Sequence, residues 1–205
     1  MDLSEPSAAV CPSLEGPVLA VLSATTRPLS VRDVARLTRR GSFEGTRKAL
    51  HRLTEHGLVR VQEAGNATLY HLNRSHLAAP AVDVLVAMRG ALLARITDAI
   101  AGWDTSPVHA SVFGSAARGD GNTSSDIDLF LVRPKGVAES DPAWRAQADR
   151  LSEQILDWTG NHLGLSEVGQ SDLPRVAKTA AGRNIRKDGI TVTGQPVEKV
   201  LGIAR

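Results

Sequence analysis

Two short apolar runs joined by a polar loop constrain the fold of this chain more than any other feature. The runs cover residues 108–113 and 127–132, and the loop between them is rich in Gly, Asn and Ser. Such runs, bounded by turn-forming residues, are typical of buried β-strands. Because side chains alternate along a strand, Asp126 and Asp128 at the start of the second run would share one face. Adjacent carboxylates repel each other unless a cation lies between them, so the pair predicts a Mg²⁺ site.

A glycine and a serine directly follow the first predicted strand. Gly114 would let a phosphate approach the backbone, because glycine has no Cβ. Residues 116–118 are expected to begin a helix, whose first N–H groups would point toward the same place. The Ser115 hydroxyl would add a further donor. The sequence therefore predicts an anion-binding turn beside the carboxylate pair.

The spacing of these residues resembles the signature of the DNA polymerase β-like nucleotidyltransferases, and most closely that of the minimal nucleotidyltransferase domains of bacteria and archaea. The family pattern is an apolar residue, Gly and Gly or Ser, a spacer, and then two acids that alternate with apolar residues. Here the spacer has ten residues. The matching residues are Phe113, Gly114, Ser115, Asp126, Ile127, Asp128 and Leu129.

The resemblance implies transfer of NMP from ATP or another NTP to an acceptor hydroxyl, with release of pyrophosphate. Asp126 and Asp128 would bridge two Mg²⁺ ions, while Ser115 and the Gly114 backbone would hold the β- and γ-phosphates. Arg118 would neutralise triphosphate charge, although an exposed helical Arg is an equally ordinary interpretation.

The resemblance also implies a third carboxylate, carried by the next strand, that positions a metal ion and activates the attacking hydroxyl. Glu167 is the first candidate, because it falls in the strand expected over residues 162–168. Asp172 is the alternative, although it stands at an expected helix N-terminus and could simply cap that helix.

The N-terminal part of the chain has the layout of a winged helix-turn-helix. Helices are expected over residues 14–24, 31–38 and 42–56, with strands from 58 and 68–72 joined by a turn at Gly65-Asn66. The run TRKALHRLTEHGLV resembles the recognition helix and first wing strand of bacterial winged-helix regulators. The resemblance covers residues 14–73 and implies a DNA-binding domain.

Charge supports this interpretation. Between Arg27 and Arg60 there are nine Lys or Arg and three Asp or Glu, a local charge of +6 against +2 for the chain. The candidate DNA contacts lie on the third helix, away from its apolar stripe: Arg47, Lys48, His51 and Arg52. A solvated basic face, or a winged helix used for protein contact, would give the same pattern.

The domain prediction follows from these elements. Residues 1–13 are expected to be disordered, 14–77 to form the winged helix-turn-helix, 78–102 a connecting helix and 103–205 the nucleotidyltransferase domain. The fold class is α+β or mixed α/β, with a small mixed sheet covered by helices on one face. Helices are expected over residues 142–159, 171–187 and 197–203, and a last strand over 190–193. The connecting helix could also pair with the same helix of a second copy, so a homodimer is a further prediction.

Composition favours the cytoplasm and offers no membrane span. The single cysteine, Cys11, suits a reducing compartment, and no apolar run reaches the roughly 18 residues that a span requires. Three functions stay open: an enzyme that acts on a protein, RNA or small-molecule hydroxyl, a DNA-binding regulator that binds nucleotide without turnover, and an antitoxin-type protein that binds a toxin-like partner.

Overall fold

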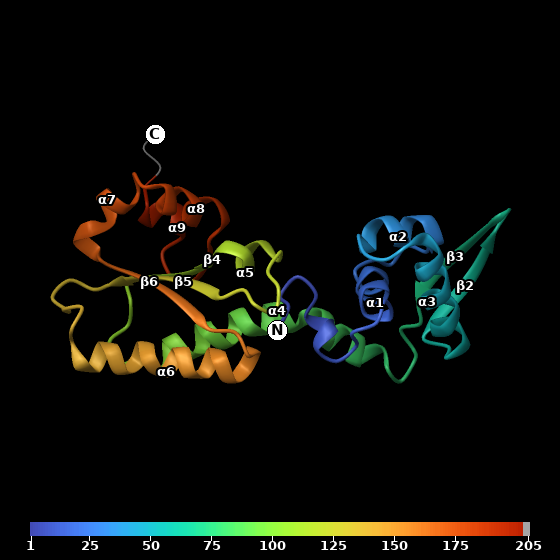
Figure 1. Cartoon of the computed structure of the whole chain (residues 1–205), viewed down its shortest axis with the longest axis horizontal. Coiled ribbons are helices and arrows are strands. Elements are labelled where there is room, and N and C mark those ends of the chain that lie inside the picture. The colour runs from blue at the N-terminus through green and yellow to red at the C-terminus, as the bar shows by residue number, and fades with distance from the viewer. Residues whose placement is uncertain (203–205) are drawn as a thin grey trace. The chain divides into compact units, whose positions relative to one another are not determined.

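A computed structural model describes residues 1–202, which form two compact units (Figure 1). One unit is Glu5–Arg89, and the other joins Met1–Ser4 to the chain from Gly90 onward. The long helix α4 (Ala79–Ala101) begins in the first unit and ends in the second.

The first unit contains three helices and a three-stranded antiparallel sheet of order β1-β3-β2. A short 3₁₀ helix, η1 (Pro6–Ala9), precedes them. The elements are α1 (Glu15–Ser23), β1 (Leu29–Ser30), α2 (Val31–Thr38), α3 (Phe43–Glu55), β2 (Val59–Ala64) and β3 (Ala67–Leu72). Apart from the two-residue β1, which the sequence did not reveal, the predicted helices and hairpin are confirmed to within a few residues.

Local chemistry fixes where these helices start. The side chain of Ser30 accepts a hydrogen bond from the backbone N–H of Asp33, and that of Ser42 accepts one from Gly45. Each serine therefore satisfies a backbone N–H that has no partner within its helix. The apolar faces then pack into one core, formed by Val18, Leu19, Leu22, Val34, Ala49, Leu50, Leu53, Leu58, Val59, Leu72 and Val82.

The second unit is built on a four-stranded mixed sheet of order β6-β5-β4-β7. Strand β4 pairs antiparallel with both β5 and β7, whereas β5 pairs parallel with β6. The strands are β4 (His109–Phe113), β5 (Ile127–Arg133), β6 (Leu163–Gly169) and β7 (Ile190–Gly194). The predicted small mixed sheet is thereby confirmed, and the parallel β5–β6 connection runs through α6 (Pro142–Thr159).

Helices cover both faces of this sheet rather than the one face expected (Figure 1). Ile127, Leu129 and Leu131 of β5 pack with α6 and the second half of α4. Phe130 and Val132, which point the other way, pack with three short helices. These are α7 (Leu173–Val176), α8 (Ala180–Asp188) and α9 (Val197–Val200). Because both faces are buried, β5 is apolar at nearly every position instead of alternating.

The helix predicted over residues 171–187 is broken in the structure. A 3₁₀ turn, η2 (Gln170–Asp172), leads into α7, and Thr179 then caps α8 by accepting a hydrogen bond from Gly182. A Cβ on Gly182 would lie 2.1 Å from the carbonyl oxygen of Val176, so the two helices meet at a glycine that permits close approach.

Both ends of the chain also differ from the sequence prediction. Leu3, in the segment expected to be disordered, is 5% exposed and belongs to the core beneath the sheet. Met1 packs against the same core, and two isolated apolar residues give no periodicity from which this packing could be predicted. The closing helix expected over residues 197–203 ends at Val200 as α9, and residue 203 lies outside the described residues.

Candidate functional site

Asp126 and Asp128 flank the first residue of β5. Asp128 is half-buried and Asp126 is exposed, while Ile127 between them is fully buried on the opposite face. The backbone N–H of Ile127 donates to the carbonyl of His162 at 2.8 Å, which fixes this end of β5 against β6. Burial, together with the charge of Asp126, raises the pKa of the Asp128 carboxyl, and Arg118 partly offsets this. A bound cation would relieve the electrostatic repulsion between these two neighbouring carboxylates.

The Gly114-Ser115 turn lies directly against this pair. Gly114 opens the five-residue helix α5 (Gly114–Arg118) in the left-handed region at φ +66°, and a Cβ there would lie 2.3 Å from Oδ2 of Asp128. Ordinary contacts begin near 3.4 Å, so any larger residue would have to adopt a strained backbone and displace the Asp128 side chain. Ser115 faces the loop that follows, since a Cβ on Gly121 would lie 3.0 Å from its hydroxyl oxygen. The structure thus brings Gly114 and Asp128 together, while the Ser115 hydroxyl lies toward Gly121.

Arg118 at the end of α5 forms two ion pairs. Its Nε lies 2.9 Å from Asp120, and its Nη1 lies 3.0 Å from Asp188 at the end of α8. These contacts lower the pKa of Asp120 and raise that of Arg118. Asp188 had no role in the sequence prediction. No local spacing could have revealed it, because the two residues are 70 positions apart.

The candidates for a third carboxylate do not join the aspartate pair. Glu167 stands opposite Leu131 in the β5–β6 register, on the face opposite to Asp128, and pairs with Arg133 at 2.5 Å. Both side chains of this pair are 10% exposed. Asp172 lies 3.4 Å from Arg175, within its own turn. The expected role of Glu167 is therefore not supported, because its pairing opposite Leu131 places the side chain on the other face of the sheet.

The position on β6 that faces Asp128 is occupied by Gly164. Its Cα is the register partner of Asp128, and a Cβ there would lie 2.9 Å from Oδ1 of Asp128 and 3.6 Å from the Cβ of Asp126. Ser166, two residues on, shares this face and is exposed. Within residues 1–202 there is no group of three or more His, Cys, Asp or Glu side chains placed to hold a metal ion.

In the first unit, the four predicted DNA contacts do share one surface. Arg47, Lys48, His51 and Arg52 line a single shallow hollow on α3. Three of them contact acids: Arg47 lies 2.6 Å from Glu44, His51 lies 3.2 Å from Glu55, and Arg52 pairs with Glu15. These contacts reduce the positive field that α3 presents to solvent, a feature that a count of basic residues does not reveal.

Comparisons with known proteins bear on the second unit. Residues 100–170 match the family model described as a nucleotidyltransferase domain. This segment contains β4, α5, β5, α6 and β6, and therefore every residue of the aspartate and glycine–serine site. No curated protein and no solved structure matches the chain. No helix within residues 1–202 is long and apolar enough to cross a membrane.

Proposed function

We propose that the chain is a nucleotidyltransferase that moves NMP from an NTP to the hydroxyl of a protein, RNA or small-molecule acceptor. One observation carries this proposal: the Asp126–Asp128 pair lies against the Gly114-Ser115 turn, within the segment that matches the nucleotidyltransferase family model. A carboxylate pair and a glycine turn at one place are what a metal–triphosphate complex requires.

The aspartate pair fits a divalent cation. The raised pKa of Asp128, caused by burial and by its neighbour Asp126, is the property that a cation would reverse. Asp126 and Asp128 would hold Mg²⁺, which would neutralise phosphate charge when bound. Two carboxylates with glycine at position 164 offer ligands for one ion, so a second ion would depend on oxygens of the nucleotide and on water.

The remaining residues would position the triphosphate. The absence of a side chain at Gly114 leaves the backbone open to a phosphate, and Ser115 would donate its hydroxyl. Arg118 would reach the phosphates only by exchanging Asp120 and Asp188 for them. A phosphate group accepts charge-assisted hydrogen bonds at least as well as a carboxylate does, so this exchange is chemically reasonable.

A second function is favoured by the glycine at position 164. Without a carboxylate there, activation of the attacking hydroxyl has no assigned residue, and the domain would bind nucleotide without turnover. The first unit supports a regulatory version of this function, because three helices and a three-stranded antiparallel sheet suit a winged helix-turn-helix with α3 on DNA. An antitoxin-type protein would use both units, with a toxin-like partner or as a homodimer.

Label transfer distinguishes the two functions. The purified chain is incubated with each α-labelled NTP and with Mg²⁺ or Mn²⁺, with and without host extract. Label that appears on protein, RNA or a small molecule, and disappears with Asp126→Ala and Asp128→Ala, supports transfer. Glu153→Gln serves as the control carboxylate, because Glu153 is an exposed residue of α6, which packs on the other sheet face, and the variant should retain the label.

Binding measurements test the regulatory function. Nucleotide that binds with a Mg²⁺ requirement but gives no label on any acceptor would favour a binding module over an enzyme. Replacing Arg47, Lys48, His51 and Arg52 with Gln should then weaken DNA binding, and an unchanged DNA affinity would exclude α3 as the contact surface.

A further inference from the structure

The buried residue Asn161 joins the end of α6 to the loop that precedes the aspartate pair. It lies in the short turn between α6 and β6 and is 3% exposed. Its Nδ2 donates to the backbone carbonyl of Ser125 at 2.9 Å, and its Oδ1 accepts from the nitrogen of Met1. Asn161 and Ser125 are 36 positions apart, so no local pattern in the sequence could reveal this contact.

The direction of the Asn161 side chain follows from the chemistry of its partners. A backbone carbonyl accepts and a main-chain nitrogen donates, so the Nδ2 end must face Ser125 and the Oδ1 end must face Met1. The backbone N–H of Asn161 also donates to Oγ1 of Thr159 at 3.0 Å, which holds the residue against the last turn of α6. These three hydrogen bonds fix both the position and the direction of the amide.

The turn between α6 and β6 holds both peptide groups that flank Asp126. Asn161 donates to the carbonyl of Ser125, and the carbonyl of the next residue, His162, accepts from the N–H of Ile127 at 2.8 Å. The backbone of Asp126 is therefore anchored on each side to the same two-residue segment. Loss of the Asn161 side chain would release the side toward the loop, while β5 stays paired with β6.

Asp126 depends on its backbone for its position. The residue is exposed, so packing does not hold its side chain. Asp128 carries the same charge, and the two carboxylates repel each other when no cation lies between them. Residues 119–126, which lead to the pair, contain no helix or strand. A loop of this kind would let Asp126 move away from Asp128 unless something outside the loop held it.

Asn161 supplies this hold. Within the loop, the N–H of Asn122 donates to Oγ of Ser125 at 3.0 Å, and the N–H of Ser125 donates to the carbonyl of Asn122 at 3.1 Å. These two hydrogen bonds set the local shape of the loop, but they do not join it to the sheet or to a helix. The hydrogen bond from Asn161 does so, and it acts on the last residue before Asp126.

We propose that Asn161 is a positioning residue, which holds the Ser125 carbonyl so that Asp126 stays beside Asp128 and the pair can bind a divalent cation. This inference rests on the proposed transferase function, because it concerns the same aspartate pair. Asn161 acts through the backbone of the loop and not as a ligand. Removal of a group that orients a metal ligand from behind typically weakens metal binding by about 10–100-fold.

Binding of Mn²⁺ to the full chain, measured from the electron paramagnetic resonance signal of the free ion, tests the inference without turnover. Mn²⁺ takes the same oxygen ligands as Mg²⁺. Asn161→Ala should bind Mn²⁺ about 10–100-fold more weakly than the parent chain. Backbone amides of residues 120–126 should also exchange hydrogen faster in metal-free Asn161→Ala, because the loop has lost its attachment to α6.

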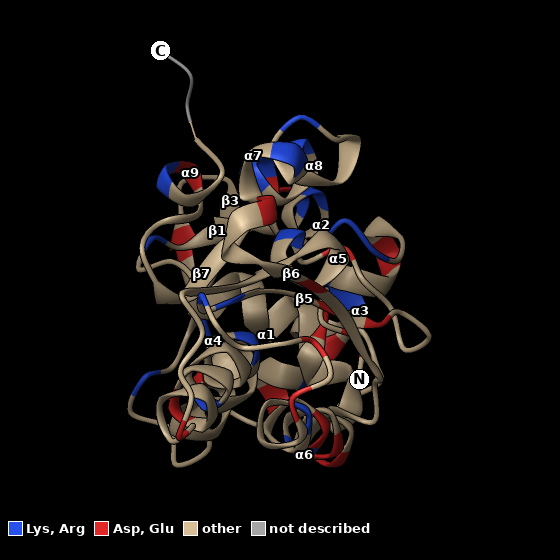
Figure 2. Ribbon diagram, turned by 90° about the vertical axis from the view of Figure 1, so that its left-hand side faces the viewer, with Lys and Arg blue, Asp and Glu red and all other residues tan. Residues whose placement is uncertain are grey.

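The acids of α6 require a correction for background binding. Residues 141–159 contain four Asp or Glu against two Lys or Arg, and Figure 2 shows the red residues along α6. Exposed acids attract cations without forming a site. The Mn²⁺ that still binds to the chain carrying Asp126→Ala and Asp128→Ala therefore defines the background, and the remainder belongs to the aspartate pair.

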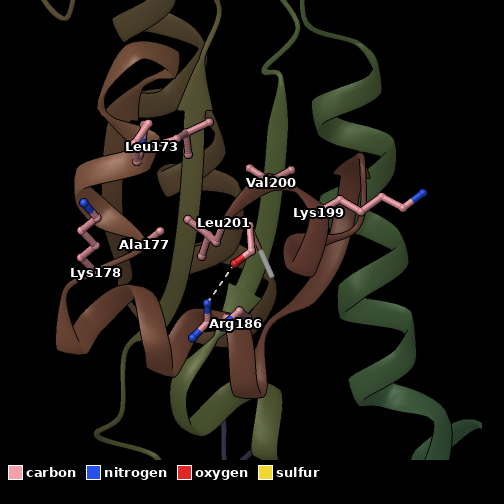
Figure 3. Close-up of a pocket in the computed structure, with 9 residues that line it drawn as sticks. Leu173, Ala177, Lys178, Arg186, Lys199, Val200 and Leu201 are labelled. Atoms are coloured by element: carbon pink, nitrogen blue, oxygen red, sulfur yellow. Dashed lines mark hydrogen bonds between the residues drawn. The ribbon is translucent and has the colours of Figure 1, made fainter. Parts of the chain in front are cut away.

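Two control variants remove hydrogen bonds to the backbone elsewhere in the same unit. The side-chain amide of Gln147 accepts from the N–H of Thr105 at 3.2 Å and donates to its carbonyl at 3.3 Å. Arg186 donates to the carbonyl of Gly202 at 3.1 Å, beside an open pocket of about 870 Å³ among α7, α8 and α9 (Figure 3). Gln147→Ala and Arg186→Ala should bind Mn²⁺ within about twofold of the parent, because neither bond involves residues 120–126.

Two outcomes would overturn the inference. The first is Asn161→Ala that binds Mn²⁺ as tightly as the parent does. The second is equal weakening in Asn161→Ala and in both controls, because the effect would then reflect a general loss of stability. If Asn161→Ala does not fold, Asn161→Ser takes its place with the same expected result, since a hydroxyl has one polar atom and cannot hold both Ser125 and Met1.

Label transfer separates this inference from the proposed function. A parent chain whose Mn²⁺ binding depends on Asn161, but which never transfers label, would leave the inference standing and remove the transferase proposal. Label transfer together with Mn²⁺ binding that does not depend on Asn161 would do the reverse. A parent chain that binds no Mn²⁺ above the background would overturn both.

Discussion

Gly114→Ala is the substitution whose effect the structure predicts in most detail. It has two separable costs. The left-handed backbone at φ +66° costs a residue with a Cβ about 1–2 kcal/mol. The new Cβ would also lie 2.3 Å from Oδ2 of Asp128, more than 1 Å inside an ordinary contact, so Asp128 must leave its rotamer for about a further 0.5–1.5 kcal/mol.

Gly160→Ala provides the control for the backbone cost. Gly160 has φ +71° in the same unit, and nothing lies within 4 Å of its hypothetical Cβ. Thermal melts should therefore show a loss of about 2–8 °C for Gly160→Ala and a larger loss for Gly114→Ala, at roughly 2–4 °C per kcal/mol. Titration with Mg²⁺ should raise the melting temperature of the parent and of Gly160→Ala, but not that of Gly114→Ala.

A double substitution isolates the contact. In an Asp128→Ala background the carboxylate is gone, so Gly114→Ala should cost only the backbone term and match Gly160→Ala. If Gly114→Ala were no more destabilising than Gly160→Ala in the parent chain, Asp128 would not lie over the glycine, and the geometry proposed for the site would be refuted.

Other predictions concern the pH dependence and the stability of each unit. Burial lowers the pKa of His109, whose Nδ1 lies 2.8 Å from the carbonyl of Gln195, so the unfolded chain takes up this proton first as pH falls. The contribution of neutral His109 to stability should be fully present above about pH 6.5 and decline below it. The urea midpoint of the parent chain should therefore be lower at pH 5.5 than at pH 8, and this difference should be much smaller in His109→Gln. Glu167→Gln leaves the buried Arg133 without its charged partner and should lower the free energy of unfolding in urea by about 3–5 kcal/mol. Mg²⁺-dependent nucleotide binding should stay unchanged. Normal stability together with lost nucleotide binding would instead place Glu167 in the aspartate site. Ser42→Ala removes the cap of α3 and should cost about 1 kcal/mol in the first unit, and a loss below about 0.3 kcal/mol would contradict the cap.

Local patterns in the sequence were sufficient for most elements. The helix over residues 142–159 was recognisable from Asp141 and Pro142, and the structure shows the expected cap, with Asp141 accepting from the backbone N–H of Trp144 at 3.0 Å. The turn at Gly114 and the alternation of Asp126 and Asp128 are also short-range features. Each depends only on neighbouring residues, so each could be predicted without knowledge of the fold.

Features that depend on register or on distant residues could not be predicted. Glu167 was placed in the correct strand, but its face depends on which residue of β6 pairs with Asp128, and one residue of shift reverses the answer. The contact of Arg118 with Asp188 and the break at Gly182 both require helices to be packed in space. Tertiary packing decides such features, and a single sequence contains no direct record of it.

The glycine at position 164 is one base change away from an acidic residue, and an acid there would complete a three-carboxylate site. Every glycine codon becomes an aspartate or glutamate codon by changing its second base, so one point mutation would introduce an acid beside Asp128. Nothing but the Asp128 side chain stands within 3 Å of the added Cβ, and that side chain can rotate. Point mutation would therefore produce the three-carboxylate site readily, so natural selection must either maintain the glycine or tolerate it.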